Sequence, residues 1–164
     1  MPVPPFDSDG FLEPGRHVAT AAEMKAALVD GIPGSNNRAQ LFAAWATHLE
    51  TLTYLIEVQR QWIGGSFVSA KLDPGDVDAV SFFDGVVLDA LPEQHRRLIK
   101  YMCSGHSARP YWGCDAFCVA VYAPEHPWHA LTEQAIAYWD NWWGHTRAGA
   151  DSQPRARGYL EVSA

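Results

Sequence analysis

The sequence predicts one α/β domain of the α+β kind, in which helices pack on a mixed β-sheet. Two apolar, β-branched segments, residues 77–87 and 115–122, are typical of buried strands. Apolar residues at helical spacing over residues 41–52 indicate an amphipathic helix, so helical and strand patterns alternate along the chain. The 164 residues are 48% hydrophobic and 19% charged, which is enough apolar material to bury one core.

The expected elements follow one another without repeats or a low-complexity linker. Residues 1–19 are rich in Pro, Gly and Asp and should form an extended N-terminal arm, which leaves residues 20–164 as one domain. Thr20 and Glu23 have the spacing of a capping box, which predicts a helix to about residue 29. After it we expect a helix capped by Ser35 or Asn36 and ending near residue 55, a strand approach over 55–63, a turn or short helix over 66–71, a strand over 77–87, a helix from Pro92 to about residue 103, a loop over 104–113, a strand over 115–122, a helix from residue 129 or 130 to 143, and an edge strand over 158–162.

Charge and cysteine usage exclude several classes of protein. A net charge of −7 disfavours binding to an extended nucleic acid, which requires clustered Lys and Arg. No apolar run approaches the roughly 18 residues that cross a bilayer, and the N-terminus lacks the basic and apolar regions of a signal peptide. Three cysteines without a C-x-x-C pair argue against a disulfide scaffold. We therefore expect a soluble cytoplasmic protein with no membrane partner.

Tryptophan is concentrated in the last third of the chain, which holds five of the seven. One interpretation is an aromatic core packed against the C-terminal helix, and the other is a surface that binds a protein partner. The five residues are Trp112, Trp128, Trp139, Trp142 and Trp143.

The most informative segment covers residues 63–80. An apolar stretch ends in Gly-Gly-Ser at positions 64–66, and nine residues then separate Ser66 from Asp76. Asp76 and Asp78 flank one valine and lead directly into an apolar strand. The segment therefore combines a flexible glycine turn, a hydroxyl and two acids beside a predicted strand.

Each part of this segment has a physical use. Glycines allow a backbone to approach a ligand closely, and a serine that opens a helix offers its hydroxyl and neighbouring N–H groups to a phosphate. Asp76 and Asp78 point to the same face of a strand, where two like charges repel unless a cation such as Mg²⁺ lies between them. The alternative is an ordinary surface turn at residues 74–76, whose Pro-Gly-Asp composition is common in turns. That alternative explains Asp76 better than it explains Asp78 or the glycine pair.

The segment resembles the signature of the polymerase-β-like nucleotidyltransferases, in which Gly-Ser and a short spacer precede Asp-x-Asp and an apolar residue. The chain is also similar to a group of small bacterial and phage nucleotidyltransferase-like proteins that have a Pro-Pro-Phe arm, here residues 4–6, and a Gly-Ser-Phe core, here residues 65–67. The resemblance is strong over residues 60–82 and loose elsewhere. It implies a nucleotidyltransferase-like fold with the acids on one face of the sheet and helices packed on the other.

In that superfamily a third carboxylate comes from a later strand of the same sheet. Asp115 is the first choice, because it begins the next strongly predicted strand, where an acid is costly without a partner or a metal. Asp84 and Asp89 compete with it, but they lie at or beyond a strand end, where solvated acids are common. If Asp115 completes the site, its carboxylate should converge with those of Asp76 and Asp78 at one end of the sheet.

The resemblance implies the transfer of a nucleoside monophosphate from an NTP to an acceptor, with Mg²⁺ or Mn²⁺ as cofactor. Asp115 would also orient the acceptor hydroxyl, and Lys71 lies within the spacer, from which it can reach a phosphate. The expected metal ligands are Asp76, Asp78 and Asp115, and the expected phosphate-binding residues are Gly65, Ser66 and Lys71.

The acceptor and the activity itself are left open by the sequence. Members of this superfamily modify proteins, as in toxin–antitoxin pairs, or small molecules or transfer RNA, and the short chain favours a protein acceptor or a partner subunit. The rival hypothesis is a catalytically inactive nucleotidyltransferase-fold protein that only binds or interacts, and the scarcity of basic residues favours it. The other basic candidates are Arg96, Arg97, Lys100, Arg155 and Arg157, and the histidines His95, His106 and His145 show no metal-ligand spacing.

Overall fold

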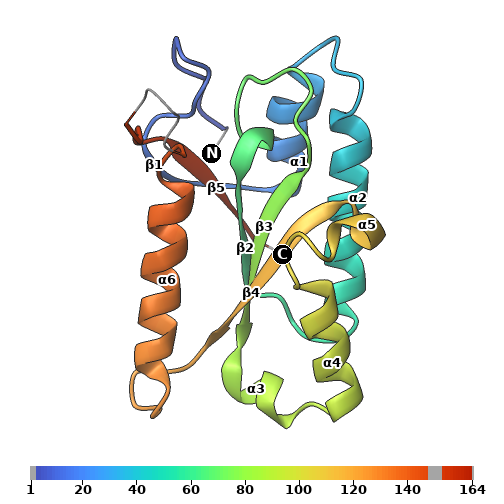
Figure 1. The fold of residues 1–164 in the computed structure, drawn as a ribbon, viewed down its shortest axis with the longest axis vertical. Helices are drawn as coiled ribbons and strands as arrows, with labels where there is room; N and C mark the ends of the chain where they lie inside the picture. Colours follow the sequence, from blue (N-terminus) through green and yellow to red (C-terminus); the bar gives the residue numbers. More distant parts are fainter. Residues whose placement is uncertain (1–2, 148–152, 164) are drawn as a thin grey trace.

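The computed structural model describes residues 3–147 and 153–163 and is built on a five-stranded mixed sheet (Figure 1). The strands are β1 (Gly15–Ala19), β2 (Arg60–Gly64), β3 (Val77–Asp84), β4 (Cys114–Val121) and β5 (Gly158–Val162). Their order across the sheet is β1-β5-β2-β3-β4. β1 and β5 are parallel, as are β3 and β4, whereas β2 is antiparallel to both of its neighbours. The predicted α+β class with a mixed sheet is therefore confirmed.

Local signals set the beginnings of the first helices. The predicted capping box is present: Thr20 Oγ1 accepts from the Glu23 backbone N–H at 3.1 Å, and Glu23 Oε2 accepts from the Thr20 N–H at 2.8 Å. Ser35 Oγ accepts from the Arg38 N–H at 3.1 Å, but the N-cap residue of the long second helix is Asn37, whose side chain makes no capping hydrogen bond, so the predicted cap at Ser35 or Asn36 lies one or two residues too early. The helical elements are α1 (Ala21–Lys25), the π-helix η1 (Ala26–Asp30), α2 (Arg38–Thr53), the 3₁₀-helix η2 (Gly65–Phe67), α3 (Gly85–Ala90), α4 (Glu93–Met102), α5 (Arg109–Trp112) and α6 (His129–Trp143).

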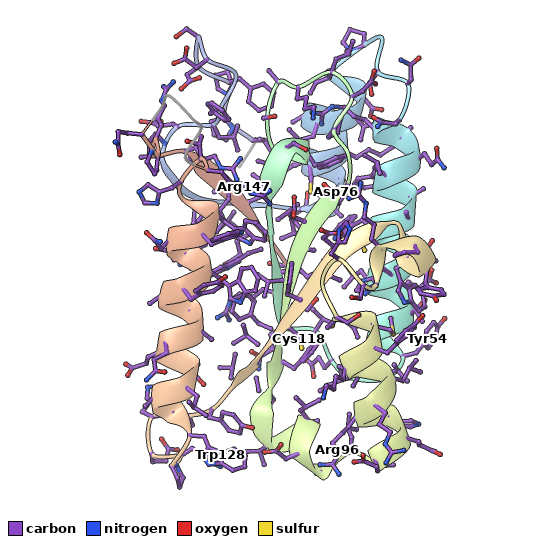
Figure 2. The ribbon with its side chains drawn as sticks, viewed as in Figure 1. Tyr54, Asp76, Arg96, Cys118, Trp128 and Arg147 are labelled. Carbon is purple, nitrogen blue, oxygen red and sulfur yellow. The ribbon has the colours of Figure 1, made fainter. Side chains whose placement is uncertain are left out.

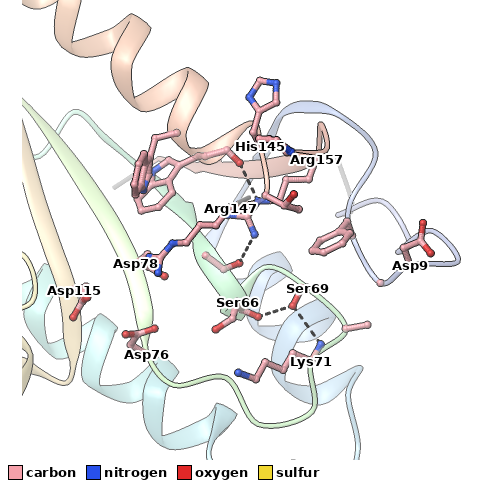
Figure 3. A pocket seen from close by; sticks show the side chains of 18 of the residues that line it. Asp9, Ser66, Ser69, Lys71, Asp76, Asp78, Asp115, His145, Arg147 and Arg157 are labelled. Atoms are coloured by element: carbon pink, nitrogen blue, oxygen red, sulfur yellow. Dashed lines mark hydrogen bonds between the residues drawn. The ribbon is translucent and has the colours of Figure 1, made fainter. Parts of the chain in front are cut away.

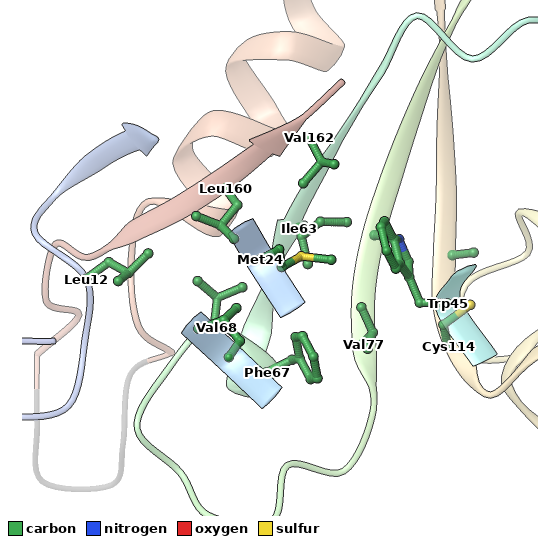
Figure 4. Close-up of a cluster of buried hydrophobic side chains, with 13 residues drawn as sticks. Leu12, Met24, Trp45, Ile63, Phe67, Val68, Val77, Cys114, Leu160 and Val162 are labelled. Atoms are coloured by element: carbon green, nitrogen blue, oxygen red, sulfur yellow. The ribbon is translucent and has the colours of Figure 1, made fainter. Parts of the chain in front are cut away.

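One face of the sheet packs against α1, η1 and α2. Figure 4 shows Met24 and Trp45 from these helices against Val77 and Cys114 of the sheet, all of them buried. The polar end of Trp45 is satisfied, because its Nε1 donates to Gln61 Oε1 at 2.8 Å. A second cluster continues this face towards α4; it comprises Leu52, Ile56, Val58, Phe83, Ile99 and Met102.

The opposite face of the sheet is covered by α6, which lies apart from α2 and α4 in Figure 1. Val80 and Phe82 of β3 pack there with the fully buried Trp62 and with Trp143 near the end of α6. Residues with even numbers on β3 face α6, and this is also the face of Asp78. The expectation that the helices would pack only on the face without the acids is therefore wrong, since α6 runs along the acid-bearing face and ends beside it.

Three expected elements differ from the structure. The C-terminal strand β5 is not an edge strand but lies between β1 and β2, because residues 15–19 of the predicted arm form the outer strand. The strand predicted to residue 87 ends at Asp84, whose carboxylate accepts from the Val86 and Val87 N–H groups and caps α3. The predicted loop 104–113 contains the short helix α5.

Tryptophan and cysteine residues are divided between core and surface. Trp143 is buried, which confirms the core interpretation for this residue, whereas Trp128 and Trp142 are 49% and 43% exposed, and the partner-binding surface stays a prediction. The three cysteines are free thiols. Within the described ranges, no helix has the length and apolar character needed to cross a membrane.

Candidate functional site

The turn after β2 brings the backbone into close contact with a carboxylate. Gly65 has a φ of 68°, a left-handed conformation that favours glycine. A Cβ atom at this position would lie less than 3 Å from Asp78 Oδ2. Gly64 pairs with Asp78 across β2 and β3, and a Cβ there would collide with the ring of Trp143. The glycine pair therefore leaves room for a carboxylate and an indole directly against the end of β2.

Two carboxylates lie side by side where β3 and β4 begin (Figure 3). Asp78 and Asp115 are register partners on these parallel strands, whose axes are about 4.8 Å apart. Asp76 precedes Asp78 by two residues and points to the same face. The side chains of Asp76 and Asp115 are only 16% and 15% exposed. The register thus brings together three acids that are as many as 39 positions apart in the chain.

The electrostatics of Asp78 are those of a buried carboxylate among like charges. Burial, followed by the negative charges of Asp76 and Asp115, raises the pKa of Asp78 from 3.8 to about 6. The same environment acts on Cys114, where burial and then these two acids raise the thiol pKa to about 12. Asp115 Oδ1 is buried and accepts no hydrogen bond from any residue that the structure describes. A buried oxygen of this kind costs about 1–3 kcal/mol unless it has a partner, so the cluster is suited to receive a cation or a donor.

The other two acids have an arginine and a histidine as neighbours, both from the segment before β4. Arg109 of α5 forms an ion pair with Asp76, with Nη1 and Oδ2 2.9 Å apart, and also donates to the Gly75 carbonyl at 2.8 Å. His106 Nδ1 lies 3.4 Å from Asp115 Oδ2. Among the described residues, no group of three or more His, Cys, Asp or Glu side chains is arranged to hold a metal ion. Asp76 is turned towards Arg109, and the metal role of the three acids stays a prediction.

The spacer between Ser66 and Asp76 is ordered by a buried arginine that the sequence analysis missed. Arg38, at the start of α2 and only 1% exposed, donates to the carbonyls of Phe67, Ser69 and Lys71 at 2.7–2.8 Å. One guanidinium thus fixes three carbonyls of one loop, and burial lowers its pKa. Because nothing local in the sequence connects Arg38 to this loop, only the packing of α2 against it reveals the role.

A cavity of about 1460 Å³ opens beside these residues. This volume exceeds the roughly 300–1,000 Å³ of typical small-molecule sites, so the cavity has room for two ligands. All six residues of the predicted site line it, which brings them together in one place; their binding roles stay predictions. Its other charged or titratable lining residues are Asp9, His106, Arg109, His145, Arg147 and Arg157.

The rival acids lie away from this cavity. Asp84 caps α3, and Asp89 accepts a 2.9 Å hydrogen bond from the Tyr122 hydroxyl. Both functions are structural, which agrees with the preference for Asp115. Of the basic candidates, Arg96 and Arg97 form surface ion pairs with Glu93 on α4.

The N-terminal arm forms one wall of the cavity through residues 8–11. Phe11 bridges to Ser69 of the spacer, and the Ala70 N–H donates to the Gly10 carbonyl at 2.8 Å. Arg155 forms ion pairs with Asp7 and Asp9, which ties the arm to the segment before β5. The arm therefore packs against the domain, and Arg155 holds the arm while Arg157 lines the cavity.

Sequence comparison assigns the chain to a family rather than to a characterised activity. Neither a curated protein nor a solved structure matches the chain significantly. The model of one family matches residues 4–163, which is nearly the whole chain. The chain belongs to this family, described as "Family of unknown function (DUF6932)".

Proposed function

We propose that this protein is a metal-dependent nucleotidyltransferase that moves a nucleoside monophosphate from an NTP to an acceptor. The observation that carries the proposal is the register pairing of Asp78 with Asp115 directly beside the Gly65 turn, inside one large cavity. This places acids of the kind that bind metals next to a turn of the kind that binds phosphates. The resemblance of residues 60–82 to polymerase-β-like nucleotidyltransferases supports the same conclusion.

The side chains present fit a divalent metal ion in their chemistry. The buried Asp115 Oδ1 without a partner and the raised pKa of Asp78, caused first by burial and then by its acidic neighbours, both indicate excess negative charge that a cation would relieve. Asp78 and Asp115 would hold Mg²⁺ or Mn²⁺, joined by Asp76 once it leaves Arg109. When bound, such an ion would neutralise phosphate charge and polarise the acceptor oxygen.

The protein's own groups would bind and orient the two substrates. Gly65 and Ser66 would hold the β- and γ-phosphates, and Asp115 would orient the acceptor hydroxyl towards the α-phosphorus. The new bond joins the acceptor oxygen to that phosphorus, the bond between the α-phosphorus and the bridging oxygen breaks, and pyrophosphate leaves. The hydroxyl proton passes to a carboxylate of the cluster and from there to solvent.

A protein acceptor, or a partner subunit, suits the surface next to the cavity. Trp128, Leu131, Tyr138 and Trp142 are exposed by 43–58% and recur along one face of α6. Trp142 also lines the cavity, so this aromatic face leads to the proposed site. Exposed aromatic residues of this kind are enriched where proteins bind proteins. We therefore propose a protein hydroxyl as the acceptor, as in toxin–antitoxin pairs.

A second candidate is a nucleotidyltransferase-fold protein that binds a ligand without turnover. The ion pair between Arg109 and Asp76 favours it, because the guanidinium occupies a carboxylate that catalysis would need for metal. Both candidates bind a ligand in this cavity, but only the enzyme converts it to products.

Incubation with labelled NTPs and cell lysate tests the proposal. We expect one protein to acquire label from α-labelled NTP in the presence of Mg²⁺, and no label with EDTA or with γ-labelled NTP, since the γ-phosphate leaves with pyrophosphate. Nucleotide binding in a thermal melt without any transfer of label would favour the second candidate.

Ser66→Ala is expected to weaken NTP binding severalfold while the protein stays folded. The substitution removes one hydroxyl contact to a phosphate, a loss of about 0.5–1.5 kcal/mol for a neutral hydrogen bond and more for a charged one. Ser66 Oγ donates to no residue that the structure describes, so the fold should not depend on it. Titration calorimetry with Mg²⁺ and each NTP measures the change. Ser69→Ala is the comparison, because the Ser69 hydroxyl already donates to the Ser66 carbonyl at 2.7 Å; equal NTP affinity of Ser66→Ala and the parent would place the phosphates elsewhere.

A further inference from the structure

Two arginines, from the segments on either side of residues 148–152, converge on the cavity next to Asp78. Arg147 follows α6, Arg157 precedes β5, and both line the cavity. The pKa of Arg157 is lowered, first by burial, and Arg147 contributes to the same shift. Two cations are thus held near one another, which costs free energy that an anion between them would recover.

The orientation of Arg157 is fixed by the backbone. Its Nη1 donates to the Gly65 carbonyl at 3.1 Å, and its Nε donates to the Trp143 carbonyl at the end of α6 at 3.2 Å. The guanidinium therefore lies against the same glycine turn that carries Ser66. Its Nη2 donates to no residue in the described part of the chain, so donors remain for a ligand.

Arg147 is held less tightly and is exposed. Its guanidinium carbon lies 5.9 Å from the centre of the Trp142 ring. Within residues 3–147 and 153–163 it has neither an ion pair nor a hydrogen bond to a side chain. Both arginines therefore offer guanidinium donors to the cavity, one from a fixed position and one from an exposed side chain.

The nearby acids have other basic residues as partners. Asp76 pairs with Arg109, Asp9 pairs with Arg155, and Asp115 has His106 as its neighbour. Among the described residues, neither Arg147 nor Arg157 forms an ion pair with any of these acids or with Asp78. The side of the cavity beside α6 thus carries two guanidinium groups that are outside these ion pairs, although the whole chain carries −7.

We propose that Arg147 and Arg157 bind the phosphate chain of the nucleotide, and that the cavity binds a polyphosphate anion even without metal. Guanidinium groups suit this role, because their planar donors match phosphate oxygens in pairs. The identity of the anion as part of an NTP rests on the proposed function, whereas the anion site itself rests on the two arginines and the turn beside them.

The geometry separates these arginines from Lys71, the basic residue singled out by the sequence. Figure 3 shows Arg147 and Arg157 on one side of Ser66 and Lys71 on the other. The side chain of Lys71 should therefore contribute less to binding of the phosphate chain than Arg147 does.

Titration calorimetry with inorganic tripolyphosphate, in EDTA at fixed ionic strength, tests this inference. Arg147→Gln should weaken binding at least about fivefold, as expected for lost hydrogen bonds to a charged group, and Arg147→Lys should fall between Arg147→Gln and the parent. Arg96→Gln removes the same charge at the opposite end of the molecule (Figure 2) and should bind as the parent does. Lys71→Gln should have a smaller effect than Arg147→Gln. Arg147 carries the test because it is exposed, whereas Arg157→Gln also removes two hydrogen bonds to the backbone.

Two results would overturn the inference: a parent protein that does not bind tripolyphosphate, and an Arg147→Gln variant that binds it as tightly as the parent. The outcome is separate from that of the proposed function. Binding that depends on Arg147, in a protein that never transfers label from an NTP, would leave the anion site standing and remove the enzyme. Transfer that requires Mg²⁺ but is unchanged by Arg147→Gln would support the enzyme and remove the anion site.

Discussion

Asp78→Asn is expected to raise the free energy of unfolding by roughly 2–3 kcal/mol at pH 7, because about 1.4 kcal/mol corresponds to each unit of pKa shift. Burial, then the charges of Asp76 and Asp115, raise the pKa of the folded protein's Asp78 from 3.8 to about 6. Ionisation of this carboxylate therefore destabilises the fold, and asparagine has nearly the same shape without the charge.

The sign of the effect defines its pH window. Folded Asp78 binds its proton more tightly than the unfolded chain does, so the parent loses stability as pH rises from about 4 to about 6. The difference between variant and parent should be near zero below about pH 3 and complete above about pH 7. Urea unfolding at a series of pH values measures it, with Asp84→Asn as the control, since asparagine can still cap α3. If Asp78→Asn were no more stable than the parent at pH 7, ionisation of Asp78 would not destabilise the folded protein.

The same substitution should remove Mg²⁺ binding. The metal would relieve the repulsion that makes the ligand-free parent unstable, so Mg²⁺ should raise the unfolding midpoint of the parent and leave that of Asp78→Asn unchanged. Calorimetric titration with Mg²⁺ gives the affinity directly. Equal affinity in both proteins would contradict the metal role of Asp78 and, with it, the proposed function.

Gly65→Ala is expected to be the most destabilising small substitution at the site, by roughly 2–4 kcal/mol. About 1–2 kcal/mol arises from placing a side chain in the left-handed region, since φ is 68°. The rest comes from a Cβ that would lie less than 3 Å from Asp78 Oδ2 and force that carboxylate to move. Chemical unfolding of the purified variant gives the loss.

Gly34→Ala is the matched control for this prediction. Gly34 has a φ of 89°, but a Cβ there would meet nothing within 4 Å, so only the backbone contribution remains. Combining Gly65→Ala with Asp78→Ala should recover the part of the loss that comes from the clash, which a double-mutant cycle isolates. The close contact would be refuted by a Gly65→Ala variant that loses no more stability than Gly34→Ala.

Local chemistry explains why several elements could be predicted from the sequence. The strand of residues 115–122 and the helix from residue 129 to 143 are long and strongly patterned, and the structure has them as β4 and α6 within one residue. The cap at Thr20 depends only on the next three residues. The predicted edge strand failed for the opposite reason, because the place of a strand in a sheet depends on which partners reach it.

The predicted site also has a part that depends on local sequence and a part that depends on strand pairing. The sequence alone identified a glycine turn and an acid pair, since the spacing of Gly65, Asp76 and Asp78 lies within one short segment. The register that sets Asp115 beside Asp78 depends on the pairing of two strands joined by about 30 residues, and the sequence could only suggest it through a resemblance.

Of the arginines that line the cavity, Arg157 was a candidate in the sequence, and the tertiary structure decided the place of all of them. Arg109, Arg147 and Arg157 reach the cavity from three separate segments, and Arg38 orders the spacer from the start of α2. Arginines on surface-like segments carry no local signal of their partners, because a long flexible side chain finds its acceptor through the packing of the elements that bear it. The sequence by itself determined which residues are acidic, flexible and apolar at this end of the sheet. The tertiary structure decided which positive charges meet them, since charge interactions depend on distance in space rather than on distance along the chain.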